Sequence, residues 1–289
     1  MYPASFEYFA PTSLDEALET LERFGDEAKV LAGGQSLIPL LKLRVTAPRA
    51  LVDINRVEGL DGLAEKGGRL RIGALVRHKT CERSDLLKQR YGVLGSTAPQ
   101  VSDPIVRNLG TVCGSVAHAD PQGDWGSALL AIGADVVVRG PSGERTIPID
   151  ELFQGPFMTA LEPGEIVTRI DVADPGARAG GQYLKLERKV GDFATAAVAV
   201  HVSLSNGTIG RAGIALTGVG PTNLKAREAE EALAGAEPTD EAITTAARLA
   251  AEGAEPLDDN RGSAEYKRNV VRVFTERALR ASVAAAREA

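Results

Sequence analysis

Two short glycine-rich stretches carry the residues best suited to hold a charged ligand. The first, Ala32–Ser36, follows the apolar run Ala28–Leu31 and precedes the helix-like stretch Leu37–Leu41. Glycine lets a backbone turn sharply and approach a ligand closely. A helix N-terminus adds unpaired N–H groups and the positive end of its dipole. The first stretch therefore predicts a phosphate or pyrophosphate site, and an ordinary strand–turn–helix corner is the alternative.

The second stretch, Gly110–Ser115, lies much later in the chain and runs on through His118 to Asp124. It is also rich in small residues, and we expect it to form a loop. Two such loops could grip the two ends of one dinucleotide. Asp124 can also be read as the N-cap of a helix that begins at Trp125, and the two roles are compatible.

Other chemistry is less well supported by the residue types present. Cys113 and His118 could act as a nucleophile and its base in a hydrolase. They share a predicted loop, which does not enforce contact, and no oxyanion-binding arrangement is evident. As metal ligands, His118 and His201 lack the spacing of a zinc site. His201 lies in the apolar run Ala197–Val202 and is expected to be a strand residue.

Composition narrows the class of protein. The chain has 289 residues, enough for two or three domains, with a formal net charge of −6 and a pI of about 5.3. An acidic chain argues against nucleic acid as a main partner. No apolar run is long enough to span a bilayer. The first basic residue is Arg23, so no signal peptide is expected.

The number of cysteines and the absence of two nucleotide-binding motifs narrow the class of protein further. The only cysteines are Cys81 and Cys113, too few for an iron–sulfur cluster, which usually takes four thiolates. They need not be paired, which fits a reducing cytoplasm, and we expect a cytoplasmic protein. Neither a Gly-x-Gly-x-x-Gly fingerprint after a strand nor a P-loop motif is present.

The residues before about position 57 read as a compact α/β unit. Phe6–Phe9 alternates like a strand, and Ser13 with Glu16 forms a capping box for a helix that ends at Gly25. The strand into the first glycine-rich stretch follows. The next helix ends near Arg44, and a third strand follows it, Leu51–Ile54. Strands alternating with helices over so short a segment are typical of an α/β unit.

Residues 58–175 predict a mixed sheet with helices packed against it. The predicted elements are short strands within Leu60–Val76, a helical region Thr80–Gln100, a helix Trp125–Ile132, a strand Ala134–Arg139 with a hairpin turn at Pro141–Gly143, and a strand Ile166–Val172. Ala173–Gly176 is a cluster of breakers and marks the predicted domain boundary.

Residues 176–289 predict a domain in which strands precede helices. Three strands should form an antiparallel sheet, and three helical segments should cover it. The strands are Gln182–Leu186, Thr195–Leu204 and Thr208–Thr217, and the helices are Asn223–Leu233, Glu241–Glu252 and Ser263–Ala286. The whole chain is therefore expected to be α+β.

Taken together, these motifs resemble the FAD-binding medium subunit of the molybdenum hydroxylases. That family pairs Ala-Gly-Gly-x-Ser with a later Thr-x-Gly-Gly-Asn/Ser followed by Pro-x-x-Asp, which here are Ala32–Ser36, Thr111–Ser115 and Pro121–Asp124. Arg188–Ala194 adds a third match. The resemblance runs from Phe6 to the C-terminus. Carbon monoxide dehydrogenase and its relatives carry such a subunit, and xanthine dehydrogenase carries it as a domain.

The resemblance implies a fold and a domain division. Residues 1–175 would be a vanillyl-alcohol-oxidase/PCMH-type FAD-binding domain with α/β subdomains of about 1–57 and 58–175. Residues 176–289 would be a carbon monoxide dehydrogenase flavoprotein-like C-terminal domain, with an antiparallel sheet and helices.

It also implies a role as an oxidoreductase subunit. The substrate would be oxidised at a molybdenum cofactor on a large subunit, and electrons would pass through iron–sulfur clusters on a small subunit to FAD on this chain and then to an external acceptor. The expected assembly is a dimer of heterotrimers with no nucleic acid and no membrane span. The chain itself would hold no metal and no catalytic residue, and would be inactive on substrate alone. A stand-alone flavin oxidoreductase and a scaffold subunit that has lost its flavin are the alternatives.

The resemblance assigns FAD contacts residue by residue. Asp124 would form a hydrogen bond with the ribitol or ribose. Lys185 would meet a negative flavin or phosphate, although Lys185, Arg188 and Lys189 could be a solvated strand end. Phe193 would cover the isoalloxazine ring or else be a core residue. The full predicted set is Leu31, Ala32, Gly33, Gly34, Gln35, Ser36, Leu37, Val101, Gly110, Thr111, Cys113, Gly114, Ser115, Ala117, His118, Asp124, Ile166, Val167, Lys185 and Phe193.

Cys113 departs from the family pattern, which usually has glycine at that position. Its side chain would either crowd the flavin phosphates or be tolerated by the loop.

Overall fold

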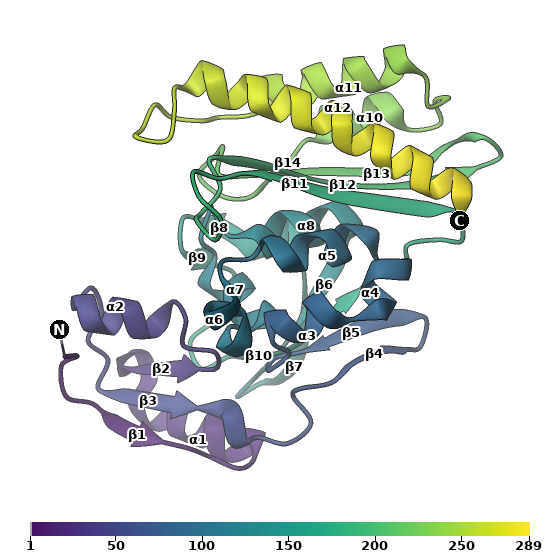
Figure 1. The fold of residues 1–289 in the computed structure, drawn as a ribbon. Helices are drawn as coiled ribbons and strands as arrows, with labels where there is room; N and C mark the ends of the chain where they lie inside the picture. The colour runs from purple at the N-terminus through teal and green to yellow at the C-terminus, as the bar shows by residue number, and fades with distance from the viewer. Residues whose placement is uncertain (1) are drawn as a thin grey trace.

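A small parallel sheet with one helix on each side forms the N-terminal part of the protein (Figure 1). The computed structural model describes residues 2–289. The strands run in the order β1-β3-β2 and pair in parallel. The elements are β1 (Glu7–Phe9), α1 (Leu14–Phe24), η1 (Gly25–Glu27), β2 (Ala28–Leu31), α2 (Leu37–Leu43), β3 (Ala50–Asp53) and η2 (Ile54–Arg56).

Helix α1 shows how the local sequence sets an element. The Ser13 side chain accepts a hydrogen bond from the Glu16 N–H and caps the helix, as predicted. The Glu16 carboxylate reaches back to the Thr12 N–H, one residue further than in the standard capping box. Ala17, Leu21 and Phe24 are buried on one face of the helix, which anchors it on the sheet.

An antiparallel sheet forms the base of the middle part, with strand order β4-β5-β10-β6-β7. All its pairings are antiparallel, so the predicted mixed sheet is wrong. Its strands are β4 (Leu63–Lys66), β5 (Arg69–Gly73), β6 (Ala134–Gly140), β7 (Gly143–Pro148) and β10 (Ile166–Val172), and a separate two-stranded ribbon contains β8 (Phe153–Gly155) and β9 (Met158–Thr159).

The middle helices are shorter and more numerous than predicted. The predicted helical region Thr80–Gln100 is broken at Ser84 and Tyr91, and the expected loop Gly110–Ser115 is mostly the first turns of a helix. The helices are α3 (His78–Arg83), α4 (Asp85–Arg90), α5 (Gly92–Thr97), η3 (Ala98–Gln100), α6 (Pro104–Leu109), α7 (Val112–His118), α8 (Asp124–Ile132) and α9 (Ile149–Leu152).

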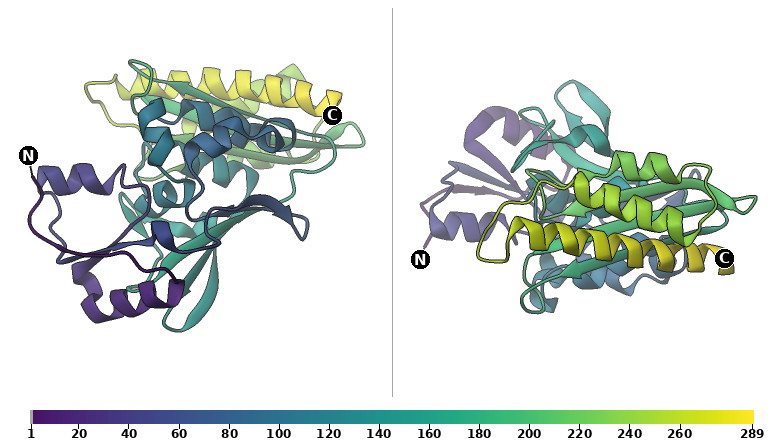
Figure 2. Two further views of the ribbon diagram at one scale, coloured as in Figure 1. Left: turned by 60° about the horizontal axis from the view of Figure 1, so that its bottom comes forward. Right: turned by 90° about the horizontal axis from the view of Figure 1, so that it is seen from above.

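The C-terminal part is a four-stranded antiparallel sheet with helices across its outer face (Figure 2). Its opposite face packs on α5 and α8 of the middle part. The elements are β11 (Ala179–Leu186), β12 (Ala196–Ser205), β13 (Thr208–Thr217), β14 (Leu224–Lys225), α10 (Arg227–Leu233), α11 (Asp240–Glu252) and α12 (Ala264–Glu288). The helix predicted from Asn223 begins only at Arg227, because Leu224 and Lys225 extend the sheet instead.

Two hydrophobic cores follow from this arrangement. The larger one joins the N-terminal and middle parts, from Ala17 through Val52 to Trp125, and reaches Tyr183 of β11. The second lies between the C-terminal sheet and its helices. The boundary predicted near residue 175 falls in the connection between β10 and β11 and stays a prediction. No helix among residues 2–289 is both long and apolar enough to cross a membrane.

Candidate cofactor-binding site

A cavity of about 1020 Å³ lies where the first glycine-rich loop, α7, the end of β11 and the loop after β11 meet. Small-molecule and cofactor pockets typically measure about 300–1,000 Å³, so this cavity is large enough for a dinucleotide. Every residue in the predicted contact set lines it, from Leu31 in β2 to Phe193 beyond β11. The structure thus brings the whole set to one place. Contact of each residue with FAD remains a prediction.

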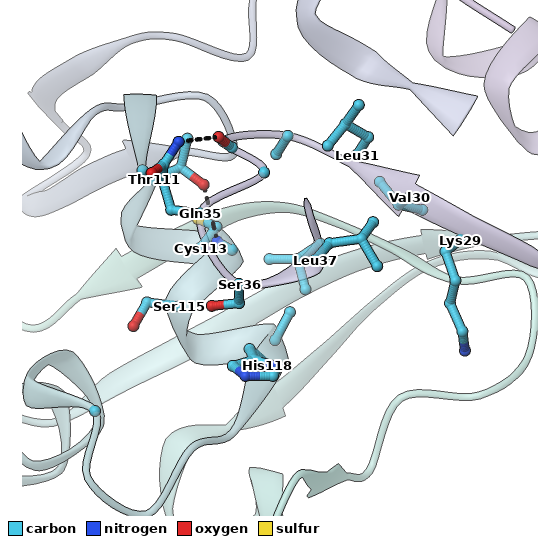
Figure 3. A pocket seen from close by; sticks show the side chains of 18 of the residues that line it. Lys29, Val30, Leu31, Gln35, Ser36, Leu37, Thr111, Cys113, Ser115 and His118 are labelled. Carbon is cyan, nitrogen blue, oxygen red and sulfur yellow. Dashed lines mark hydrogen bonds between the residues drawn. The ribbon is translucent and has the colours of Figure 1, made fainter. Parts of the chain in front are cut away.

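The first loop, Ala32–Ser36, leaves β2 and leads into α2 at the cavity wall (Figure 3). Gly34 adopts φ +71°, a backbone conformation that favours glycine. The Gln35 side-chain amide donates a hydrogen bond to the Gly33 carbonyl at 3.3 Å. Within residues 2–289, the N–H groups of Gly34, Gln35 and Ser36 find no hydrogen-bond acceptor. These free donors suit an anionic ligand.

Helix α7 supplies the second wall. Its N-cap is Thr111, whose hydroxyl accepts a hydrogen bond from the Gly114 N–H at 3.1 Å. A cap of this kind starts a helix directly after Gly110, which explains why little of the predicted loop remains. Ser115 and His118 lie along α7, and Figure 3 shows them lining the same hollow as Ser36 of the first loop.

His78 fixes the start of the second wall, although no motif in the sequence marks it. Its Nδ1 accepts a hydrogen bond from the Trp125 indole at 3.0 Å, so the neutral ring carries its proton on Nε2. Burial, with smaller contributions from Arg107 and Arg77, lowers the pKa of His78 to about 4. A Cβ added to Gly110 would lie 2.7 Å from the His78 ring, so the ring packs directly on that glycine.

Asp124 is held in a buried network rather than acting as a helix cap. Gly123 is the N-cap of α8, so the predicted capping role of Asp124 is wrong. Its Oδ1 accepts a hydrogen bond from the Tyr183 hydroxyl at 2.6 Å, and its Oδ2 accepts one from Lys185 Nζ at 3.1 Å. Burial raises the pKa of Asp124, and the Lys185 charge and the Tyr183 hydrogen bond oppose that rise.

The positions of Lys185 and Phe193 exclude the alternative that the sequence left open for each side chain. The Lys185 side chain is only 1% exposed and pairs with Asp124, so a solvated strand end is wrong for this lysine. Phe193 is 50% exposed and lines the cavity, so it is not a core residue. Arg261 donates a hydrogen bond to the Phe193 carbonyl and pairs with Asp192, which anchors the loop that carries the ring.

Cys113 turns its thiol into the protein. Its Sγ lies 3.5 Å and 3.6 Å from the carbonyl oxygens of Ile72 and Gly73, and the residue is 2% exposed. Burial raises the pKa of the Cys113 thiol well above its usual range. A buried, protonated thiol is a poor nucleophile, so the hydrolase alternative with His118 is wrong. Because the sulfur packs against β5, the thiol is tolerated without a loop contact.

Other cavity residues have no signal in the sequence. They include a segment between β9 and β10 and two charged side chains, one in η1 and one in β2, which only the fold brings to the site: Asp26, Lys29, Leu161, Glu162, Pro163, Gly164 and Glu165. Over residues 2–289, no cluster of three or more His, Cys, Asp and Glu side chains could hold a metal ion. His201 is buried in β12, as expected for a strand residue.

We expect Cys113→Ala to bind FAD with an affinity within about threefold of the parent, because the sulfur points away from the cavity. The variant should lose about 1 kcal/mol of stability from the deleted buried atom. Flavin titration and urea unfolding measure the two quantities. A hundredfold loss of flavin affinity would instead give the sulfur a direct role.

A second prediction concerns pH. Burial lowers the pKa of both His78 and His201 to about 4, whereas an unfolded histidine titrates near 6.5. The unfolded chain therefore binds more protons between these values, and stability falls as the pH drops from about 6.5 toward 4. Each histidine should contribute a loss of about 2 kcal/mol between pH 7 and pH 5.

Replacing one of these histidines isolates the effect. His201→Gln removes one titrating group outside the cavity, so its loss of unfolding free energy between pH 7 and pH 5 should be smaller by about 2 kcal/mol. Urea unfolding at the two pH values measures the difference, in which contributions from other groups cancel. An equal loss in both proteins would contradict the assignment.

Comparison with known proteins identifies the family. Residues 4–174 match the FAD-binding domain in molybdopterin dehydrogenase, and residues 181–282 match the CO dehydrogenase flavoprotein C-terminal domain. The chain belongs to the FAD-binding medium subunits of the molybdenum hydroxylases. FAD is therefore its cofactor, and its family is one of oxidoreductases. The predicted FAD-binding domain followed by an antiparallel sheet with helices is confirmed.

Relatives match along nearly the whole chain. The carbon monoxide dehydrogenase medium chain of Hydrogenophaga pseudoflava is 41% identical over 98% of both chains. Subunit alpha of the 6-hydroxypseudooxynicotine dehydrogenase complex of Paenarthrobacter nicotinovorans is 38% identical, covering 96% of this chain and 95% of that subunit. A solved structure of the Hydrogenophaga pseudoflava carbon monoxide dehydrogenase, lacking the Mo-pyranopterin moiety of its cofactor, superposes with a TM-score of 0.95 at 43% identity over 99% of each chain.

The cavity fits the cofactor of this family. Free backbone donors at the first loop suit the pyrophosphate of FAD. The volume accommodates a dinucleotide, and a half-exposed aromatic side chain stands at the cavity wall.

Proposed function

We propose that this chain is an electron-transfer subunit. In this proposal it passes electrons from iron–sulfur clusters of a small partner subunit, through its FAD, to an external acceptor. A large partner subunit oxidises the substrate at a molybdenum cofactor. FAD, when bound, supplies reversible redox chemistry, and the protein supplies binding, orientation and electrostatics.

The observation that carries this proposal is the single cavity that both glycine-rich motifs and the Lys185–Phe193 segment line. In our proposal the free N–H groups of Gly34, Gln35 and Ser36 bind the pyrophosphate. Lys185 provides a fixed positive charge, because Asp124 and the Gln100 carbonyl hold its ammonium group in place. Phe193 shields one side of the isoalloxazine ring from water.

The need for partners follows from what the chain can bind. Its cysteines are two, Cys81 and Cys113, both buried and in different helices, whereas a cluster usually takes four thiolates. The clusters are therefore assigned to another polypeptide. The relatives named above include a medium chain and a complex subunit, which supports a multi-subunit assembly. We propose a dimer of heterotrimers.

The first test is the optical spectrum of the purified chain. It should show bound oxidised flavin that dithionite reduces and an acceptor dye reoxidises. Because these steps need only FAD and its binding site, they should occur without partners. A chain that retains no flavin after loading with FAD would favour the flavin-less scaffold and overturn the proposal.

A further inference from the structure

The two walls of the cavity touch at their glycines. A Cβ added to Gly33 would lie 2.4 Å from the Leu109 carbonyl oxygen and 2.7 Å from the Gly110 Cα. The backbones of the first loop and of the segment before α7 are therefore in direct contact. The two segments are connected to different sheets, because the first loop leaves β2 of the parallel sheet, whereas α7 packs on β5 and β10 of the antiparallel sheet. Something must hold this spacing when the ligand is absent.

A chain of side-chain hydrogen bonds spans the same junction. Asn55 Nδ2, just after β3, donates to the Ala32 carbonyl of the first loop at 2.7 Å. Arg77, just after β5, donates from Nη2 to Asn55 Oδ1 at 2.5 Å. Its Nη1 donates to the Leu109 carbonyl at 2.5 Å. The path from Ala32 to Leu109 thus passes through two side chains, one from each part of the protein.

The orientation of these groups is determined by their chemistry. The guanidinium group has no acceptor, so the Asn55 oxygen must face Arg77 and the Asn55 amide must face the Ala32 carbonyl. Asp53 reinforces this arrangement, because its Oδ1 accepts hydrogen bonds from both the backbone and the side-chain nitrogen of Asn55. Tyr8 donates to the other Asp53 oxygen at 2.6 Å. Asp53 therefore holds the Asn55 side chain in the orientation that the hydrogen bond with Arg77 requires.

Neither Asn55 nor Arg77 lines the cavity. An effect of these residues on a ligand there must act through the two loops. We propose that Asn55 and Arg77 are positioning residues that clamp the two FAD-binding loops at the spacing the cofactor requires. This inference rests on the assignment of the cavity to FAD. A prepositioned site binds more tightly because less ordering is left to be done on binding.

The test compares variants of the full chain in equilibrium flavin titrations and in stopped-flow measurements of FAD release. Arg77→Ala should raise the Kd for FAD between about tenfold and a hundredfold, the range expected for losing hydrogen bonds to a charged group. Most of the change should appear as faster release. The visible spectrum of the bound flavin should stay as in the parent, because the clamp does not touch the ring.

Three further variants separate a clamp from other causes. Arg77→Lys keeps the charge but lacks the planar fork that reaches both acceptors, so it should still weaken FAD binding several-fold. Asn55→Ala should weaken binding too, and the double variant should be no worse than Arg77→Ala alone, because both changes break one path. Asn55 is exposed, so its truncation leaves the core intact and provides a test should Arg77→Ala not fold.

Arg90→Ala is the matched control. Like Arg77, Arg90 bridges two acceptors from different parts of the chain and does not line the cavity, but its acceptors are the carboxylates of Glu65 and Asp174, away from the two loops. It should change thermal stability without changing the Kd for FAD. The inference is overturned if Arg77→Lys binds like the parent, if the effects of Asn55→Ala and Arg77→Ala add, or if FAD affinity is unchanged in every variant. Failure of the parent itself to bind FAD would overturn the proposed function instead.

Discussion

When the isolated chain is loaded with FAD and kept free of oxygen, carbon monoxide, a purine or an N-heterocycle should not reduce its flavin, so the flavin absorbance should not be bleached. Residues 2–289 contain no cluster of three or more metal-ligating side chains, and two cysteines are too few for an iron–sulfur cluster, so we expect electrons from such substrates to have no path to the flavin. Dithionite should reduce the same sample completely. The expected contrast is between no detectable reduction and full reduction, followed at the flavin absorbance.

The second half of this experiment adds the two partner subunits to the FAD-loaded chain. Bleaching by the substrate of the complex should then appear, and it should disappear again when the small subunit lacks its clusters. Reduction of the isolated chain by one of these substrates would contradict the electron-transfer role. It would favour the stand-alone flavin oxidoreductase that binds its own substrate.

Gly33→Ala should nearly abolish FAD binding. The added Cβ would lie 2.4 Å from the Leu109 carbonyl oxygen and 3.0 Å from the Thr111 nitrogen, and both are backbone atoms that cannot rotate away. The two loops must separate, and restoring their spacing around FAD should cost up to about 3 kcal/mol, the upper end for an overpacked contact, which corresponds to a rise in Kd of about a hundredfold. Flavin titration measures the Kd, and thermal unfolding of the flavin-free chain measures stability.

Substitutions at two other glycines serve as comparisons for Gly33→Ala. Gly34→Ala meets only side chains, those of Ile38 and Leu31, but strains the backbone at φ +71°, by about 1–2 kcal/mol. A rise in Kd of about tenfold is expected. Gly62→Ala enters open space and should bind FAD like the parent. If Gly33→Ala bound FAD as well as Gly62→Ala does, the close approach of the two loops would not matter for the site.

The local sequence pattern was sufficient to predict many of the strands and helices. Strands such as Ile166–Val172 and the capped helix α1 depend on side chains a few residues apart, so their periodicity and caps can be read directly. Short helices were less predictable. Helix α7 begins because the Thr111 hydroxyl caps it, yet its sequence of small residues reads equally well as a loop.

Sequence alone also identified the cofactor class and the residues that line the cavity. The motifs Ala32–Ser36 and Thr111–Ser115 are local, because a backbone that must turn sharply or approach a ligand needs small residues in consecutive positions. Their order and the later segment Arg188–Ala194 pointed to one family, and the match of that family to the chain confirms it.

Only the tertiary structure decided what each site residue does. Asp124 and Tyr183 are 59 positions apart, His78 and Trp125 are 47 apart, and Arg77 and Leu109 are 32 apart. No periodicity links such pairs, because their contact depends on how separate sheets and helices pack. The sequence by itself therefore determined the cofactor through the family and the stretches that line the cavity. Packing between those stretches decided that Lys185 is buried, that the Cys113 thiol faces β5, and that Gly33 must be glycine because another backbone lies against it.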